Sequence, residues 1–368
     1  MMTLASLIKT FASDFIDRHQ GAILPSQLKA LSVMRDCRSS LSPVMLAQCD
    51  DCDKQVFVPH SCGHRNCPHC QSHESQQWLT RQLKKQVPAD YFLITFTLPS
   101  ELRRLAWRHQ RVLYAMMMSC AWETVKTFAQ NDKALQGIAG VISVLHTHSR
   151  RLDYHPHVHL VMPAGAIDRE KNLWRTKEQE GNKHYLFHHK ALAKIFRAKM
   201  LEAINQAGLT LPRRLPKSWV VDCKFAGNGE KALVYLGRYL YKGVIQEKDI
   251  LSCEDGRVRF RYQDSKSKMM KVRTLSGVAF LRLILQHVLP KGFRRTRNFG
   301  FLHPNSKDLI ALLQMVTGVK TTGLNWLRER PKFKCQCCGG LMKIMKTRIR
   351  PQLRVFYESM MQIDKEAT

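Results

Sequence analysis

Apolar residues recur at helical spacing in several long stretches of the chain. Near the N-terminus, one stripe is formed by Leu4, Ile8, Phe11 and Phe15, and Pro25 then interrupts the pattern. The same spacing predicts further helices over residues 27–34, 71–86, 102–128, 190–207 and 230–245. The last of these has its leucines on one side only, so we expect one buried and one exposed face.

Short runs rich in β-branched and aromatic residues lie between these helices. They predict strands over residues 91–98, 141–146, 158–162, 219–225, 257–262 and 271–275. A polar turn at 149–153 separates the second strand from the third, which predicts an antiparallel hairpin. Strands mixed with long helices around such a hairpin indicate an α+β fold.

Changes in composition divide the chain into four expected parts. They are a helical segment over 1–36, a cysteine-rich domain over 37–85, a strand-and-helix domain over 86–310, and a basic C-terminal region over 311–368.

The charge and the cysteine content indicate which molecules and metals the protein binds. The 368 residues include 59 Lys and Arg against 29 Asp and Glu, a formal net charge of +30, which favours a nucleic-acid partner. No stretch reaches the ~18 uncharged apolar residues of a membrane span, so we expect no membrane partner and a cytoplasmic location. In that reducing compartment the 12 cysteines are expected to bind metal rather than form disulfides.

Two Cys-x-x-Cys pairs predict a structural zinc site. Cys49 and Cys52 are separated by residues 53–66 from Cys67 and Cys70, which is close to zinc-ribbon spacing, and four thiolates close a tetrahedral site. Further candidate ligands in the same region are Cys37, His60 and Cys62.

A third pair, Cys335 and Cys338, has no second pair after it. It is equally compatible with thiols that bind no metal, with a half-site completed by distant groups, and with a local zinc site.

Two histidines at alternate positions of an apolar strand predict a second kind of metal site. His157 and His159 share one face of the strand, and a metal ion would satisfy one nitrogen of each ring. His146 or His148 on the preceding strand would supply a third ligand across the hairpin. His155 is the weaker candidate because Pro156 precedes the regular strand. The competing interpretation is a pair of core histidines satisfied by hydrogen bonds.

The helix over 230–245 carries two phenols at i and i+4. Tyr235, Tyr239 and Lys242 fall together on the side opposite the leucines, whereas Tyr241 points elsewhere. A phenol has a pKa near 10, so it needs help to become a nucleophile, which Lys242 and a nearby metal-bound phosphate could give. Packing of the tyrosines at the core edge is the alternative.

Together these motifs resemble the HUH endonuclease superfamily, and more narrowly the insertion-sequence ninety-one family of two-tyrosine rolling-circle transposases. The resemblance rests on His157-Val158-His159, on the cysteine-rich segment from Cys49 to Cys70, and on Tyr235-Leu236-Gly237-Arg238-Tyr239. It extends to residues 287–300 and to Cys338-Gly339-Gly340.

The resemblance implies a ferredoxin-like antiparallel sheet with flanking helices, preceded by a small zinc-binding domain. It implies a Mg²⁺ or Mn²⁺ ion at the histidines, although softness alone favours zinc, cobalt or manganese there. One tyrosine would form a 5′-phosphotyrosine bond to single-stranded DNA and free a 3′-hydroxyl, and the second would cut another strand. Implied DNA contacts are Arg238, Arg294, Arg295 and Arg297. Implied partners are single-stranded DNA at element ends and target, with host replication factors, in a bacterial cytoplasm.

Two other functions remain open at this point. A replication initiator or relaxase of a plasmid or phage would use the same chemistry, but the zinc cluster favours a transposase. A zinc-dependent DNA-binding regulator without catalysis would leave the aligned tyrosines and Lys242 unexplained.

Overall fold

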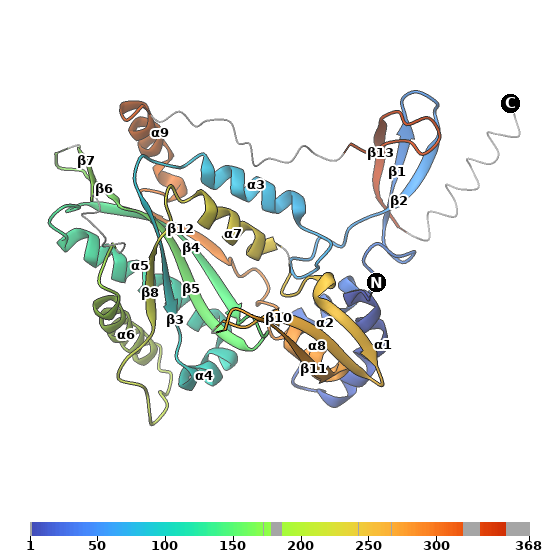
Figure 1. The fold of residues 1–368 in the computed structure, drawn as a ribbon, viewed down its shortest axis with the longest axis horizontal. Helices are drawn as coiled ribbons and strands as arrows, with labels where there is room; N and C mark the ends of the chain where they lie inside the picture. The colour runs from blue at the N-terminus through green and yellow to red at the C-terminus, as the bar shows by residue number, and fades with distance from the viewer. Residues whose placement is uncertain are drawn as a thin grey trace, which may run out of the picture.

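The computed structural model describes residues 2–171, 173–177, 186–241, 243–265, 267–318 and 332–350, without the side chains of Arg238 and Tyr239. This part of the chain forms three antiparallel sheets, and helices pack on two of these sheets (Figure 1). The predicted α+β class is confirmed.

The largest sheet has the strand order β7-β6-β4-β5-β3-β8, and β12 also pairs with β4. Its strands are β3 (Tyr91–Thr97), β4 (Ile138–His148), β5 (Tyr154–Pro163), β6 (Gly165–Asp168), β7 (Leu173–Thr176), β8 (Val221–Phe225) and β12 (Thr296–Gly300). β4 and β5 form the predicted hairpin, in which His146 lies opposite His157.

Helices cover both faces of this sheet, because alternate side chains of its strands are apolar on both (Figure 1). On one face, α5 (Gln110–Asn131) and α6 (His189–Gln206) bury Phe92, Ile94 and Phe96 of β3. On the other face, α3 (Ser72–Leu83) and α7 (Glu230–Tyr241) pack over Val144 and Val161. The predicted helix over 102–128 is divided at His109 into α4 (Arg103–Arg108) and α5.

A second core joins the N-terminal helices to a distant segment. The elements are α1 (Leu4–Arg18), α2 (Pro25–Arg35), β9 (Ile250–Glu254), β10 (Arg257–Gln263), β11 (Met270–Ser276) and α8 (Gly277–Leu285). The predicted stripe of α1 is buried, with its four side chains 8 % exposed or less, in a cluster with Phe260 and Phe280. The helices α1 and α2 therefore pack against residues 245–288.

The third sheet combines strands from both ends of the described chain, in the order β13-β1-β2. They are β1 (Val44–Cys49), β2 (Gln55–Pro59) and β13 (Met342–Ile349). Its core is small and consists of Val44, Leu46 and Ile349 with Phe57 packed against them. The sequence did not predict these strands, since most side chains of β13 are exposed and show no clear alternation.

The remaining elements are the helix α9 (Lys307–Val316) and the short 3₁₀ turns η1 (Ser100–Leu102), η2 (Glu247–Asp249) and η3 (Pro304–Ser306). None of the helices within the described ranges is both long enough and apolar enough to cross a membrane.

Gly300, where β12 pairs with β4, provides a test of the position of β12 in the largest sheet. Its backbone has φ +61°, and a Cβ atom would overlap the carbonyl oxygen of Ala139 and lie 2.7 Å from the Trp122 ring. We predict that Gly300→Ala lowers the free energy of unfolding by ~3 kcal/mol or more, because conformational strain and a backbone clash add. Gly292→Ala, at φ +76° with open space, should cost only ~1 kcal/mol. Equal shifts in urea midpoint would contradict the strand placement.

Candidate active site and metal centres

Three histidines meet at one end of the sheet face that α7 covers. His146 of β4 continues the row of Ile142 and Val144, and His157 and His159 of β5 continue the row of Val161. The ring centroids are 4.3 Å apart for His146 and His159, 4.9 Å for His157 and His159, and 5.1 Å for His146 and His157. One nitrogen of each ring lies within 4.8 Å of the other two. The structure thus brings together the set predicted from sequence.

Hydrogen bonds fix which nitrogen of each β5 ring faces this cluster. His157 donates from Nδ1 to the carbonyl oxygen of His155 over 2.7 Å, and His159 Nδ1 pairs with Thr95 Oγ1 at 2.8 Å. Both rings therefore present Nε2. Among the described residues, the buried Nε2 of His159 has no hydrogen-bond partner. A metal ion would satisfy that atom, as bound histidines commonly have their other nitrogen fixed by hydrogen bonding.

The site also has the right charge state for a cation. Burial lowers the pKa of all three imidazoles, that of His157 to about 4 and those of His146 and His159 well below 6.5. The rings are therefore neutral near pH 7 and have lone pairs to donate. The three residues fit a divalent cation, although their role as ligands stays a prediction.

The two neighbouring histidines have other partners. His155 Nδ1 accepts a hydrogen bond of 2.8 Å from Arg103, which fits its weaker candidacy. The His148 ring lies 5.0 Å from that of His287. A register irregularity between His146 and His148 separates two residues that an ideal strand would put on one face.

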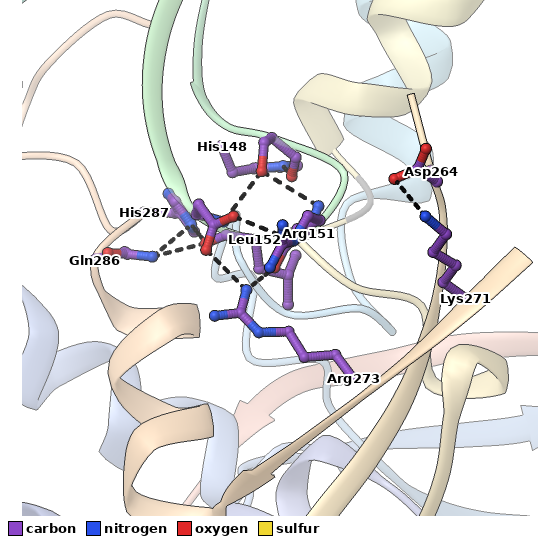
Figure 2. Close-up of polar contacts among 10 residues, drawn as sticks. His148, Arg151, Leu152, Asp264, Lys271, Arg273, Gln286 and His287 are labelled. Atoms are coloured by element: carbon purple, nitrogen blue, oxygen red, sulfur yellow. Dashed lines mark hydrogen bonds and ion pairs between the residues drawn. The ribbon is translucent and has the colours of Figure 1, made fainter. Parts of the chain in front are cut away.

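The turn of the His-bearing hairpin is held to the second core, as Figure 2 shows. The carbonyl oxygen of Leu152 accepts hydrogen bonds from Gln286 Nε2 at 2.7 Å and from His287 Nε2 at 2.9 Å. Arg273 donates to the Arg151 carbonyl oxygen at 2.7 Å and to Asp153 at 2.8 Å. These contacts hold the turn of the hairpin against β11 and the end of α8.

Tyr235 projects from α7 toward the histidines. The leucines of this helix, Leu233, Leu236 and Leu240, are buried as predicted, whereas Tyr235 is 50 % exposed. Its ring centroid lies 6.3 Å from that of His159 and 6.4 Å from that of His146. Partial burial raises the pKa of Tyr235, so the free phenol is protonated at neutral pH.

Close contact with α3 holds the tyrosine helix. Ser75 donates to the carbonyl oxygen of Gly237 at 3.0 Å, and a Cβ at Gly237 would lie 3.3 Å from the Trp78 ring. Tyr241 packs beside this contact, against the apolar cluster under α7, as expected for a residue off the catalytic face. The side chains of Arg238 and Tyr239, and the whole of Lys242, lie outside the described residues, so their roles stay predictions.

The three predicted phosphate-binding arginines have different surroundings. Arg294 and Arg297 line a cavity of about 900 Å³, with Arg81, Lys84, Lys85 and Arg111, and none of the described residues that line it is acidic. Arg295 is only 8 % exposed and donates from a guanidinium nitrogen to the Leu240 carbonyl oxygen at 3.5 Å. That position suits support of α7 better than the phosphate contact implied by the resemblance.

A second cavity, of about 500 Å³, adjoins Tyr235 itself. Its lining includes Arg150, Lys248, Arg261 and Tyr262. Exposed cations therefore lie beside the phenol as well as in the larger cavity.

The cysteines form two clusters, and this corrects the single zinc site expected from sequence. Cys67 and Cys70 group with Cys37 and Cys62, and Cys49 and Cys52 group with Cys335 and Cys338. The β1-β2 hairpin explains the separation, because Cys49 and Cys52 lie at its turn while Cys67 and Cys70 join the second core. His60 is in neither cluster and its Nδ1 contacts the carbonyl oxygen of Ser61.

Two family models match most of the chain. One, described as "Transposase zinc-binding domain", matches residues 7–98, and the other, described as "Putative transposase", matches residues 140–308. The first contains Cys37, Cys62, Cys67 and Cys70, and the second contains the three histidines and Tyr235. This chain belongs to the insertion-sequence ninety-one family of transposases.

Individual proteins agree with this membership. The chain is 29 % identical to the transposase for insertion sequence element IS801 of Pseudomonas savastanoi pv. phaseolicola, over 88 % of this chain and 84 % of that protein. It is also 29 % identical to a protein of Sinorhizobium fredii named "Putative transposase y4qJ", over 81 % of this chain and 80 % of that protein. A structure of TrwC with a 27-mer DNA aligns over 62 % of this chain and 75 % of that chain, with 11 % identity and a TM-score of 0.26. So low a TM-score establishes no further likeness.

The zinc-binding match agrees with the chemistry of the Cys37 cluster. Cys37 Sγ lies 3.5 Å from Cys70 Sγ and 3.7 Å from Cys67 Sγ, and Cys62 Sγ lies 3.6 Å from Cys70 Sγ. Four thiols at such distances form a closed sulfur set for Zn²⁺, with no coordination position open to substrate. A Zn²⁺ ion bound by these thiols would be structural and would fasten the start of α3 to the second core.

We predict that substitutions at the histidine site weaken the binding of Mn²⁺ selectively. His159→Ala should weaken Mn²⁺ affinity by roughly a hundredfold or more, because a ligand is lost, and Thr95→Val by about tenfold, because the ring loses its hydrogen bond. His155→Ala, two positions from a predicted ligand on the same strand, is the matched control and should retain wild-type affinity. Electron paramagnetic resonance of free Mn²⁺ measures all three. Unchanged affinity in folded His159→Ala would favour core histidines instead.

Proposed function

We propose that this chain cuts and rejoins single-stranded DNA during rolling-circle transposition, with Tyr235 as a nucleophile and a Mg²⁺ or Mn²⁺ ion at His146, His157 and His159. The observation that supports this most is the position of Tyr235. An exposed phenol ring lies within 6.4 Å of two imidazoles of a buried cluster whose residues fit a cation. A DNA-binding regulator would have no use for that arrangement.

The chain's own residues account for the geometry of the reaction. A divalent cation bound at the histidines would polarise the scissile phosphate as a Lewis acid. The Tyr235 oxygen attacks phosphorus, a P–O bond to tyrosine forms, and the bond from phosphorus to the 3′ oxygen breaks. The phenolic proton is released and the leaving oxygen takes up a proton, so the products are a 5′-phosphotyrosine and a 3′-hydroxyl. Attack by a 3′-hydroxyl reverses every step, and rejoining needs no ATP because the covalent bond retains the phosphodiester energy.

Strand transfer gives a second tyrosine a use. Tyr239 would cut a second strand while the first remains attached to Tyr235, and Lys242 and Arg238 would stabilise the phenolate and the phosphates from the same helix. These three assignments rest on the i, i+4 spacing on α7 and on family membership.

The basic cavities offer a path for the DNA. Six Lys and Arg side chains line the larger cavity with no acidic neighbour in the described lining, and a polyanion would relieve their mutual repulsion. Arg150 and Lys248 line the separate cavity beside Tyr235, together with Asp249, which is paired with Arg261. Contacts of this kind bind the backbone of any sequence, so the choice of element ends depends on other parts of the protein.

The nucleophile is tested by a covalent-adduct assay. With Mn²⁺ and single-stranded oligonucleotides that tile the DNA flanking the gene, wild type should form a protein–DNA adduct at a 5′ phosphate. Tyr235→Phe should reduce the adduct at least a hundredfold, because the nucleophilic oxygen is gone, and Tyr235→Phe with Tyr239→Phe should abolish it. Tyr241→Phe is the control and should react normally. An adduct in the double variant would exclude both tyrosines.

The DNA path is tested by the salt dependence of binding. Arg294→Gln with Arg297→Gln should reduce the slope of log affinity against log salt by up to ~1.4, since each phosphate contact with a single strand contributes ~0.7. Lys190→Gln with Lys194→Gln removes two exposed charges from α6, which contributes no residue to either basic cavity, and should leave the slope unchanged. Fluorescence anisotropy of labelled single-stranded DNA over a KCl series gives both values. Equal slopes for the two variants would place the DNA elsewhere.

A further inference from the structure

The second cysteine cluster joins opposite ends of the described chain. Cys49 and Cys52 lie at the turn of the β1-β2 hairpin, and Cys335 and Cys338 precede β13, which pairs with β1 (Figure 1). Cys49 Sγ and Cys338 Sγ are 3.4 Å apart, Cys52 Sγ and Cys335 Sγ 3.7 Å, and Cys52 Sγ and Cys338 Sγ 3.4 Å. These distances are too long for disulfides. They approach the ~3.8 Å between sulfurs of a tetrahedron with Zn–S bonds of ~2.3 Å.

The backbone around both pairs has the form of a metal-binding turn. The N–H of Asp51 donates to Cys49 Sγ at 3.4 Å, and the N–H of Cys337 donates to Cys335 Sγ at 3.4 Å. Hydrogen bonds of this kind favour the thiolate that a metal requires. Gly340 permits the approach of the two turns, because a Cβ there would overlap the Asp51 carboxylate.

Packing alone gives this module little stability. Its buried cluster has only three residues, Val44, Leu46 and Ile349, and in β13 most side chains are exposed, including Ile344 at 55 % and Met345 at 59 %. A core of this size rarely holds a three-stranded sheet together without a staple such as a metal ion. The four thiols lie at one end of the β13-β1-β2 sheet, where β1 ends at Cys49 and β13 begins at Met342.

We propose that Cys49, Cys52, Cys335 and Cys338 bind a second structural Zn²⁺, which fastens residues 332–350 to the N-terminal region. The zinc-binding match ends at residue 98 and contains half of these ligands. The complete module is therefore built from two segments, with the catalytic sheet inserted between them. The metal holds β13 and its exposed cations, Lys343, Lys346 and Arg348, against β1.

Cysteine alkylation of the full-length, zinc-loaded protein tests the site without any substitution. Cys52, Cys337 and Cys338 are all exposed, so accessibility alone predicts similar reactivity. With zinc bound, iodoacetamide should label Cys337 at least tenfold faster than Cys52 or Cys338, and a strong chelator should remove the difference. Equal labelling of Cys337 and Cys338 in the zinc-loaded protein would overturn the proposal. Peptide mass spectrometry distinguishes these positions.

Zinc content and amide exchange give an independent measurement. Cys335→Ser with Cys338→Ser should contain one zinc equivalent less than wild type, whereas Cys337→Ser should contain the wild-type amount. Hydrogen exchange over 342–349 should become at least tenfold faster in the double variant, with exchange in β3 unchanged. Equal zinc content of the two variants, or unchanged exchange in β13 after zinc loss, would contradict the assignment. Neither readout depends on cleavage, so a failure here is distinct from a failure of the proposed transposase chemistry.

Discussion

The pairing of β4 with β5 is the interaction on which the candidate active site depends. Side chains alternate across a strand, so the register of this pair directs Leu145 and Val158 into the core under α5 and α6. The same register directs His146 and His157 to the opposite face. A slip of one residue in either strand would turn its histidines toward α5. The apolar packing that stabilises the sheet therefore also selects the face on which the histidines meet. Helix α7 lies on that same face, with its leucines buried against the sheet and Tyr235 beside the imidazoles.

The second core complements this pairing by fixing the turn that connects β4 to β5. Leu152 is buried with a positive φ of 68°, and its carbonyl oxygen is bound from α8 and the residues just after it. The histidines lie between that anchored turn and the middle of the sheet. Such support from both ends keeps three imidazoles within range of one ion without a rigid covalent link.

Much of this arrangement could be predicted from sequence because the relevant patterns are local. Apolar periodicity gave α1, α3, α6 and α7, and alternation with a polar turn gave the β4-β5 hairpin. His146 was the residue predicted as third ligand, but alternation alone puts His148 on the same face, and the irregularity that separates the two in the structure could not be predicted from sequence. The ligand partners of Cys49 and Cys52 were assigned wrongly, because sequence spacing favours the nearby Cys67 and Cys70 over thiols almost three hundred residues away. Strand β13 was missed because it pairs with β1 across that same distance and buries few side chains, and β2 was missed because none of its side chains is fully buried.

The packing of α1 against α8 bears on the order in which this protein can fold. α1 begins at Leu4 and α8 at Gly277, so a ribosome adds about 270 residues (277 − 4) after the first helix before its partner exists. At ~5–20 residues per second, synthesis of that interval lasts roughly 14 to 55 s. Throughout that time α2 is available to pack on α1, but the part of the second core that α8 supplies is not. The second core therefore closes only after the strands of the hairpin that bears the histidines have been synthesised, so the support for its turn is among the last contacts to form.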